Sequence, residues 1–126
     1  MSKQIVHSDD APKALGPYSQ AVIYNGIVYC SGQIGLNPKT GEFAGNTVSE
    51  QAEQVMKNLE AVLSEADTNF ANVLKCTIFL ADMADFAVVN EIYGRFFTIN
   101  PPARETVAVK TLPKNALVEI GCIAIV

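Results

Sequence analysis

Arg104 lies between Pro101-Pro102 and a β-branched run that begins at Thr106. The prolines fix the backbone angle φ and cannot extend a preceding helix, so we expect Arg104 at the mouth of a buried strand over 106–110. A guanidinium offers its N–H donors in a rigid fork, which suits bidentate binding of a carboxylate or a phosphate. A surface arginine that pairs with a nearby acid is the alternative.

Glu119 is the one charged residue in the apolar segment 117–126, which is predicted to be the last strand. Burying a carboxylate without a partner is costly, so Glu119 needs a nearby cation, a solvated cleft or a raised pKa. Each of these makes it a candidate for chemistry. The alternative is an edge strand from which Glu119 points into solvent.

Gly32 and Gly35 follow a strand predicted over 27–30. Glycine lets the backbone approach a neighbour or a ligand closely, so this segment is a candidate wall of a binding site. A bulge at the end of an ordinary strand is the alternative.

The composition indicates a single globular domain over residues 1–126, because 49% of the residues are hydrophobic and 17% are charged. A net charge of −4 argues against nucleic acid and anionic membranes as partners. No run approaches the roughly 20 apolar residues that span a bilayer, and a cytoplasmic location is the simplest interpretation.

The cysteines and the histidine do not suggest a metal site. Cys30, Cys76 and Cys122 are widely spaced, each within a strand-like run, and are predicted to be small buried hydrophobic residues. His7 is the single histidine, which makes zinc ligation and a histidine-based triad improbable. We therefore expect no metal and no cofactor.

Periodicity predicts the elements that must position Arg104 and Glu119. Thr47 and Glu50 form a capping box for a helix whose apolar residues run from Val48 to Ala66. Asp82 caps a second helix, which ends before Pro101 and carries an apolar stripe with Asn90 on its inward side; the stripe is Phe86, Val89, Tyr93, Phe96 and Phe97. The remaining strands are predicted over 4–7, 21–24 and 73–80, with Asn25-Gly26 as a hairpin turn.

Strand-helix-strand units are right-handed, so both helices should cover the same face of the sheet. Leu74, Cys76, Ile78 and Leu80 should share one side of their strand. The other face would then carry uncovered Val, Ile and Cys side chains, a patch too large for a soluble monomer. We expect the chain to oligomerise through its sheet.

Several motifs in a fixed order over nearly the whole chain resemble the reactive intermediate deaminase A (RidA) family. They are Gly16-Pro17-Tyr18-Ser19-Gln20, Ser31-Gly32-Gln33-Ile34, Asn37-Pro38 with Thr40-Gly41, Val89-Asn90, the spacing of Tyr93, Phe96 and Phe97, Pro102-Ala103-Arg104, Leu112-Pro113 and Val118-Glu119-Ile120. The resemblance implies an α+β, chorismate-mutase-like domain (ferredoxin-like topology) with a mixed sheet and two helices on one face. It also implies a homotrimer with active sites between subunits and no cofactor.

The implied chemistry is hydrolysis of reactive 2-imino or enamine acids to 2-keto acids and ammonia. In this family pattern Arg104 would hold the substrate carboxylate, and Glu119 would orient or deprotonate the attacking water. Tyr18, Ser31, Gly32 and Asn90 would line the pocket, with Tyr18 contributed across the subunit interface. Many relatives have cysteine where this chain has Thr106, which is harmless if that residue acts through its backbone.

Two other functions fit parts of the pattern. A sensor of small carboxylates would use Arg104 but has no need of a base at Glu119. An endoribonuclease that inhibits translation is disfavoured by the acidic composition and by the absence of a histidine pair.

Overall fold

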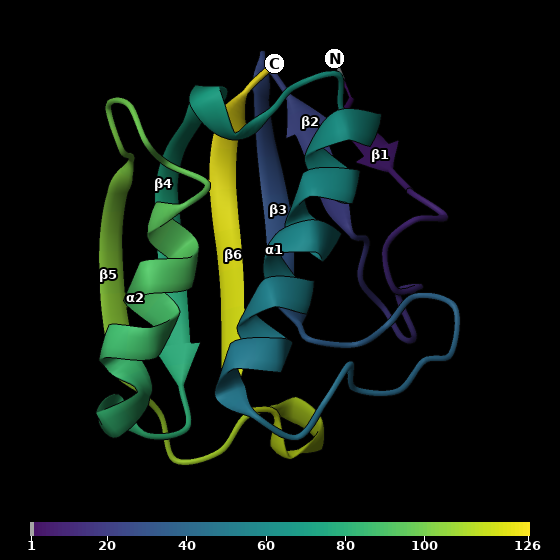
Figure 1. The fold of residues 1–126 in the computed structure, drawn as a ribbon. Coiled ribbons are helices and arrows are strands. Elements are labelled where there is room, and N and C mark those ends of the chain that lie inside the picture. Colours follow the sequence, from purple (N-terminus) through teal and green to yellow (C-terminus); the bar gives the residue numbers. More distant parts are fainter. Residues whose placement is uncertain (1) are drawn as a thin grey trace.

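In the computed structural model, which describes residues 2–126, six strands form one mixed sheet and two α-helices cross one of its faces (Figure 1). The helices are α1 (Val48–Glu65) and α2 (Phe86–Gly94). The strands are β1 (Gln4–Val6), β2 (Ala21–Tyr24), β3 (Ile27–Ile34), β4 (Val73–Leu80), β5 (Ala103–Ala108) and β6 (Val118–Ile125).

The sheet has the strand order β1-β2-β3-β6-β4-β5. The helix α2 connects β4 to β5, which pair in parallel, whereas β6 pairs antiparallel with both β3 and β4. The last strand therefore lies in the middle of the sheet. The alternative that placed Glu119 on an edge strand is wrong.

Local signals account for the predicted elements. Asn25 and Gly26 have φ values of 53° and 79°, the left-handed conformation that closes a tight hairpin between β2 and β3. Thr47 Oγ1 accepts a hydrogen bond from the Glu50 amide at 3.1 Å, and a Glu50 carboxylate oxygen accepts one from the Thr47 amide at 3.3 Å. This capping box fixes the start of α1.

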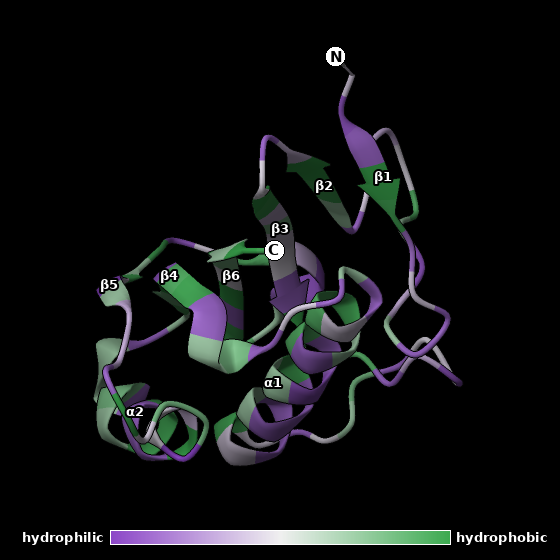
Figure 2. Cartoon of the chain, turned by 90° about the horizontal axis from the view of Figure 1, so that it is seen from above, coloured by the Kyte–Doolittle hydropathy of each residue, from purple (hydrophilic) through white to green (hydrophobic). Residues whose placement is uncertain are grey.

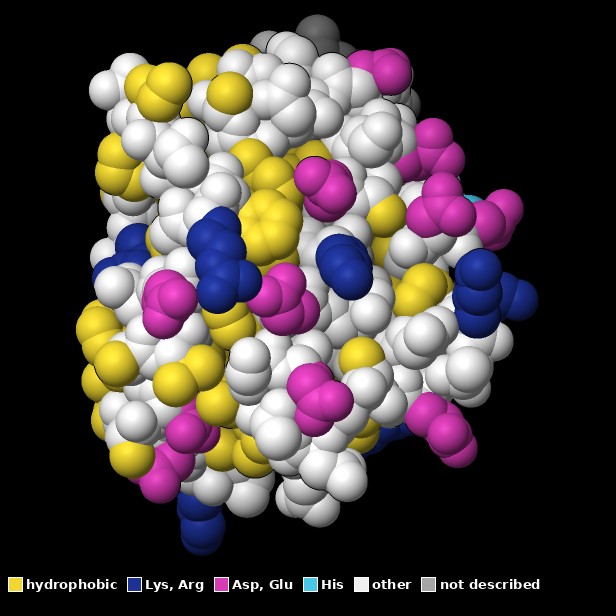
Figure 3. Space-filling view, in the orientation of Figure 1, with side chains coloured by type: hydrophobic (Ala, Val, Ile, Leu, Met, Phe, Trp, Pro, Cys, Tyr) yellow, Lys and Arg dark blue, Asp and Glu magenta, His cyan; other side chains and the backbone are white. Residues whose placement is uncertain are grey.

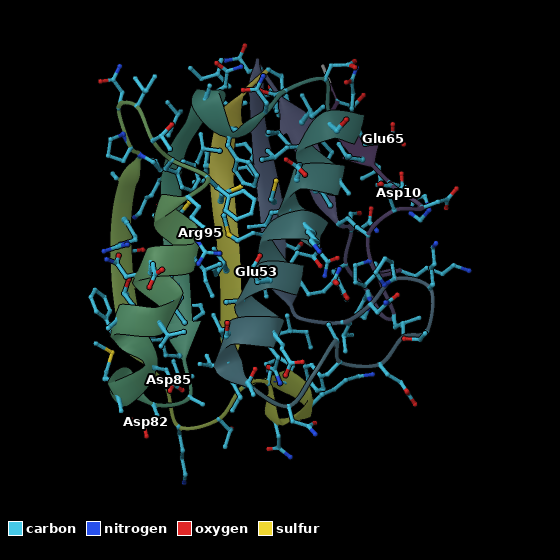
Figure 4. All side chains as sticks on the ribbon, in the orientation of Figure 1. Asp10, Glu53, Glu65, Asp82, Asp85 and Arg95 are labelled. Atoms are coloured by element: carbon cyan, nitrogen blue, oxygen red, sulfur yellow. The ribbon has the colours of Figure 1, made fainter. Side chains whose placement is uncertain are left out.

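The core lies between the sheet and the helices, which both cover the same face (Figure 2). Its largest fully buried hydrophobic side chains come from α1, β4 and β6 and include Met56, Leu59, Leu63, Ile78, Leu80 and Ile120. Arg95 follows α2, and its guanidinium lies 2.8 Å from the Glu53 carboxylate on α1, so an ion pair joins the two helices (Figure 4). On this side of the molecule, charged side chains of both signs surround the hydrophobic seam between the helices (Figure 3).

Several predicted boundaries are wrong, by one residue at the ends of β1 and β6 and by more elsewhere. β5 begins at Ala103 rather than Thr106, and β3 continues to Ile34 because a bulge between Cys30 and Gln33 lets it keep pairing with β6. Asp82 caps a short 3₁₀ turn, Met83–Asp85, and α2 follows from Phe86 to Gly94. Phe96 and Phe97 therefore lie beyond the helix that was predicted to carry them.

Two side-chain directions also differ from expectation. A register shift between Val73 and Lys75 turns Val73 inward and leaves Leu74 45% exposed. Cys76 and Cys122 are buried on the helix-covered face and do not belong to the open face. Bulges invert the alternation of side chains, and nothing in the local sequence marked the one at Leu74.

The face opposite the helices is open (Figure 2). Strand alternation places apolar residues there from four neighbouring strands, namely Tyr29, Phe79, Val107, Ile123 and Ile125. Tyr29, Val107 and Ile125 are each about 45% exposed. Within residues 2–126, neither helix combines the length and the apolar character needed to cross a bilayer.

Candidate active site

The loop before β2 is held against the sheet by Gln20, which is 2% exposed. Its side-chain oxygen accepts a hydrogen bond from the Ser8 amide at 2.6 Å, and its amide nitrogen donates to the Pro12 carbonyl at 2.8 Å. Ser31 on β3 donates its hydroxyl to the Ser19 carbonyl at 2.7 Å. These bonds fix the segment that carries Tyr18 beside the bulge in β3.

A cavity of about 490 Å³ lies between this loop and the sheet. It brings together four of the predicted site residues, Tyr18, Ser31, Gly32 and Glu119. Other parts of its wall, which sequence reasoning missed, include Lys13, Leu15, Leu36 and Lys114.

Lys114 and its neighbour Asn115 both have positive φ values, 55° and 57°. A left-handed backbone is unfavourable for residues other than glycine and recurs at binding sites. Within the short 3₁₀ turn Pro113–Asn115, Lys114 thus lies at the rim of the cavity in a backbone conformation that is unfavourable for lysine. The sequence Pro113-Lys114-Asn115 predicted a turn. It did not predict that this turn would line the cavity that contains Glu119.

Glu119 is half-buried on the open face of β6. Burial raises the pKa of its carboxyl above the ordinary value. No residue within 2–126 forms an ion pair or a hydrogen bond with its carboxylate. The structure thus supplies two of the three predicted settings, a cleft and a raised pKa, while the lysines that line the same cavity, Lys13 and Lys114, do not pair with Glu119.

Gly32 makes room for that carboxylate. A Cβ atom at Gly32 would overlap with Glu119 Oε2 and would lie 2.9 Å from its Cδ. Any larger residue must displace the Glu119 side chain. The sequence predicted that Gly32 lets the backbone approach a neighbour closely. That neighbour is the side chain of Glu119, which lines the same cavity.

Arg104 lies in a second group of residues, on the edge strand β5. Its guanidinium carbon is 5.6 Å from the centre of the Phe86 ring and 5.0 Å from that of Tyr93, both on α2. Its Nη1 donates a hydrogen bond to Asn90 Oδ1 at 2.6 Å. Asn90 is exposed and faces β5, whereas the sequence placed it on the inward side of the helix.

No carboxylate within residues 2–126 pairs with Arg104, so the interpretation of Arg104 as a surface ion-pair residue fails for this chain. The prediction of a buried strand is also wrong, because β5 is largely exposed along its length. A neighbouring cavity of about 430 Å³ is lined by Arg104, Asn90, Tyr93, Phe97 and the two prolines. The remaining guanidinium donors have no hydrogen-bond partner within residues 2–126.

Two buried hydroxyls near Arg104 lack hydrogen-bond partners among the residues that the structure describes. One is Thr106 Oγ1, two positions along β5, and the other is the Tyr93 hydroxyl, whose pKa burial raises well above its usual range. Leaving a buried hydroxyl unpaired costs about 1–3 kcal/mol. Such atoms are unusual in native proteins. The Tyr93 hydroxyl lies beside the buried Cys76 thiol, so of the two hydroxyls Thr106 Oγ1 is the one that favours a site completed by something outside this chain.

The two groups of residues lie on opposite faces of the sheet. Arg104 pairs with Cys76 and faces α2, whereas Glu119 pairs with Phe79 on the open face. Arg104 and Glu119 are two strands apart across the sheet and three residues apart along the strand direction, which puts their Cα atoms roughly 14 Å apart. A single chain therefore does not bring the predicted arginine and glutamate to one small molecule.

Known proteins resemble this chain over nearly its whole length. A family profile described as Endoribonuclease L-PSP matches residues 8–126. The human 2-iminobutanoate/2-iminopropanoate deaminase is 44% identical over 123 residues, which cover 98% of this chain and 90% of the human protein.

Solved structures agree with the sequence relatives. RidA from the Antarctic bacterium Psychrobacter sp. PAMC 21119 has a TM-score of 0.94 at 41% identity, covering 98% of this chain and 99% of that one. The E. coli protein TdcF, solved with bound serine, has a TM-score of 0.93 at 37% identity, covering 98% of each chain. This chain therefore belongs to the RidA family, whose family profile carries the description Endoribonuclease L-PSP, and it has the chorismate-mutase-like α+β fold of that family.

Proposed function

We propose that this protein is a cofactor-independent deaminase that hydrolyses 2-iminobutanoate and 2-iminopropanoate, or their enamine forms, to 2-keto acids and ammonia. The observation that carries the proposal is a pair of incomplete groups, which we call half-sites. One is Arg104, which has no acidic partner within residues 2–126, and the other is Glu119, whose pKa is raised by burial. An anionic substrate would supply the partner that Arg104 lacks, and an attacking water would supply the partner that Glu119 lacks. The name of the human relative supports the same reaction.

The proposed site is shared between two copies of the chain. Arg104, Asn90 and Thr106 come from one copy, and Glu119, Gly32 and the Tyr18 loop come from its neighbour. The open apolar face of the sheet supports this arrangement, because a face with several half-exposed apolar side chains is stabilised when another subunit covers it. We propose a homotrimer, in which a closed ring of three copies forms three such sites.

In the proposed reaction, Arg104 acts first by binding the substrate, and Glu119 then transfers protons. The guanidinium of Arg104 binds the substrate carboxylate in two directions and so fixes the imine carbon. Glu119 accepts a proton from water as the oxygen attacks that carbon, and it passes the proton to the nitrogen, which gives a carbinolamine. Glu119 then accepts the carbinolamine hydroxyl proton and delivers it to the nitrogen as the C–N bond breaks, which leaves the 2-keto acid and ammonia. A raised pKa suits a group that must both accept and donate a proton near neutral pH.

The other predicted residues act on this pair. Asn90 accepts a hydrogen bond from Arg104 and so orients the guanidinium. Ser31 holds the loop that carries Tyr18, since its hydroxyl donates to Ser19. We assign Thr106 to the carboxylate end of the site, where its buried hydroxyl has no partner within residues 2–126.

A sensor of small carboxylates remains the second candidate, because the E. coli relative was solved with serine, an amino acid that a binding protein could also hold. Glu119 distinguishes the two functions, because a deaminase needs a base that activates water and a sensor does not. The nuclease suggested by the family description has less support here. His7 contacts Asp9 at 2.9 Å on the surface and lines neither of the two cavities, and the net charge is −4.

The experiment couples the protein to a threonine dehydratase, which releases the imine, and follows the appearance of 2-ketobutanoate over time. The proposal predicts faster keto-acid release than in a matched reaction without the protein. The Arg104→Ala variant serves as the matched control and should return the rate to background. Equal rates with and without the parent protein, while serine or a keto acid still binds, would favour the sensor.

A further inference from the structure

The three cysteines form a row across neighbouring strands. Cys30 on β3 lies directly opposite Cys122 on β6, and Cys122 lies directly opposite Cys76 on β4. Residues that oppose each other in antiparallel strands share a face, and here it is the face under the helices. All three thiols are free. The three cysteines are far apart in the sequence, so the sequence did not predict that they would lie side by side.

The two ends of the row differ. Cys76 is 1% exposed, and burial raises the pKa of its thiol. Cys30 is partly exposed, and a hydrogen bond with the Cys122 thiol lowers its pKa, while the same contact raises that of Cys122. Because Cys30 is the more exposed of the two thiols and its pKa is lowered, a thiolate that peroxide can reach forms most readily at Cys30.

The backbone geometry suits a bond between these two residues. Opposed residues in an antiparallel pair have Cα atoms about 4.5–5.5 Å apart, within the range of about 4.4–6.8 Å that disulfides span. The bulge that begins after Cys30 frees β3 from strict pairing and allows the small shift that sulfur–sulfur bonding requires. The irregularity in β4 between Val73 and Lys75 also ends next to Cys76, so exposure separates the two possible pairs: Cys30 is partly exposed, whereas Cys76 is 1% exposed.

We propose that Cys30 and Cys122 are a site of reversible oxidation, at which a peroxide produces a disulfide between β3 and β6. The Cys30 thiolate attacks one peroxide oxygen, which breaks the O–O bond and gives a sulfenic acid and hydroxide. The Cys122 sulfur then attacks the Cys30 sulfur and displaces hydroxide, which takes the Cys122 proton and leaves as water. Two thiols and one hydrogen peroxide thus become one disulfide and two water molecules.

The disulfide would join two adjacent strands, β3 and β6, whose opposite face forms one wall of the Glu119 cavity. Cys30 directly precedes Ser31 and Gly32, and Cys122 lies three residues after Glu119. The bond therefore lies beside the proposed catalytic cavity but does not depend on its activity. Its formation is measured on the protein itself, so failure of the deaminase proposal and failure of this one are distinguishable.

The test treats the full-length protein with hydrogen peroxide and measures intact mass, free thiols and the linked peptides. We expect a loss of about 2 Da, a fall from three free thiols to one, and a Cys30–Cys122 peptide that dithiothreitol separates. Peptide mapping of the parent protein needs no variant and is independent of any folding defect.

Two variants sharpen the result. Cys76→Ala should still lose about 2 Da, whereas Cys30→Ala should keep its two remaining thiols unlinked at the same peroxide dose. A Cys76–Cys122 link, a link between two copies of the chain, oxygen addition without a link, or no reaction at all would each overturn the proposal.

Discussion

The Arg104 region and the Glu119 region differ in how well the chain itself satisfies their charges. Arg104 is on an edge strand, yet two aromatic rings and the Asn90 amide oxygen hold its guanidinium in place. Glu119 is on a central strand, yet no group within residues 2–126 bonds to its carboxylate, and burial raises its pKa. We propose that the first region binds an anion, and burial of the second favours protonation of its carboxylate.

This difference indicates what each half-site lacks. A fixed cation without an anion and a partly desolvated carboxylate without a cation complement one another, but they lie on opposite faces of one sheet. The fold therefore separates the two groups within a chain, and in the proposed assembly each group meets a neighbouring copy. The central claim is that substrate is bound only where two copies meet.

Glu119→Gln should have the largest effect, because it removes the proton acceptor and keeps the size of the side chain. We expect the rate of imine hydrolysis to fall by about 10²–10⁴-fold, the usual contribution of a positioned general base. Binding of a keto-acid product, measured by calorimetry, should be retained because Arg104 is intact. Since imines also hydrolyse in water, the rate without enzyme must be subtracted. Parent-like hydrolysis by this variant would mean that Glu119 is not the base.

Arg104→Lys should reduce kcat/KM by about 10²-fold, although the positive charge is kept. An ammonium group lacks the planar fork, cannot stack between Phe86 and Tyr93 in the same way, and cannot fix a carboxylate in two directions. Steady-state kinetics on 2-iminobutanoate would measure the effect. Turnover equal to the parent would reduce Arg104 to a structural residue.

Gly32 and Gly35 offer a matched pair of substitutions within the same segment. At Gly32 an added Cβ meets only the flexible end of Glu119, so Gly32→Ala should lower activity by about tenfold and leave the melting temperature nearly unchanged. At Gly35 an added Cβ would lie 2.7 Å from the Gln51 backbone. Gly35→Ala should instead cost about 1–3 kcal/mol of stability. The reverse outcome for the two variants would show that Gly32 does not position Glu119.

The smallest expected effect is on stability as a function of pH. Because the folded-state pKa of Glu119 is raised, its carboxyl favours folding most below the unfolded pKa, and that contribution is lost as pH rises through the folded value. Glu119→Gln cannot ionise. We expect it to melt at a higher temperature than its parent near pH 7, and at the same temperature near pH 4.

This comparison belongs in an Arg104→Ala background, where no guanidinium from a second copy can offset the effect of burial on Glu119. A melting temperature for the double variant that lies below that of Arg104→Ala at pH 7 would contradict the assignment of a desolvated carboxylate.

Much of the fold follows from local sequence signals. The capping box at Thr47 and Glu50, the Asn25-Gly26 turn and the helical stripe of α1 each act over a few residues, and each is confirmed. The prediction that both helices cover one face is also confirmed, because the handedness of crossovers decides it. Boundaries were less accurate where pairing between strands decides them, as at Ala103 and Ile34.

The site was harder to predict, because its contacts join residues that are distant in the sequence. Arg104 and Glu119 stand out by their surroundings in the chain, but the rings of Phe86 and Tyr93 around the guanidinium depend on how α2 packs over β5. The buried polar residues Gln20, Gln51 and Asn58 also gave no local signal. They are buried because each bonds to the backbone of a loop, and Asn58 reaches the Leu36 carbonyl at 2.9 Å.

Mixing two inactive variants tests the central claim most directly. Arg104→Ala and Glu119→Gln chains are co-expressed in equal amounts with different affinity tags, and assemblies that carry both tags are assayed for imine hydrolysis. If each site takes Arg104 from one copy and Glu119 from its neighbour, random assembly of the two chains restores about a quarter of the sites. Selecting assemblies that contain both chains raises that share.

A mixture of Glu119→Gln with Glu119→Ala chains is the matched control, since neither can supply the missing carboxylate. The account predicts that only the complementary mixture regains a substantial fraction of parent activity, while each variant alone and the control mixture stay near background. Complementary mixed assemblies that form but stay at background would contradict a site shared between two copies.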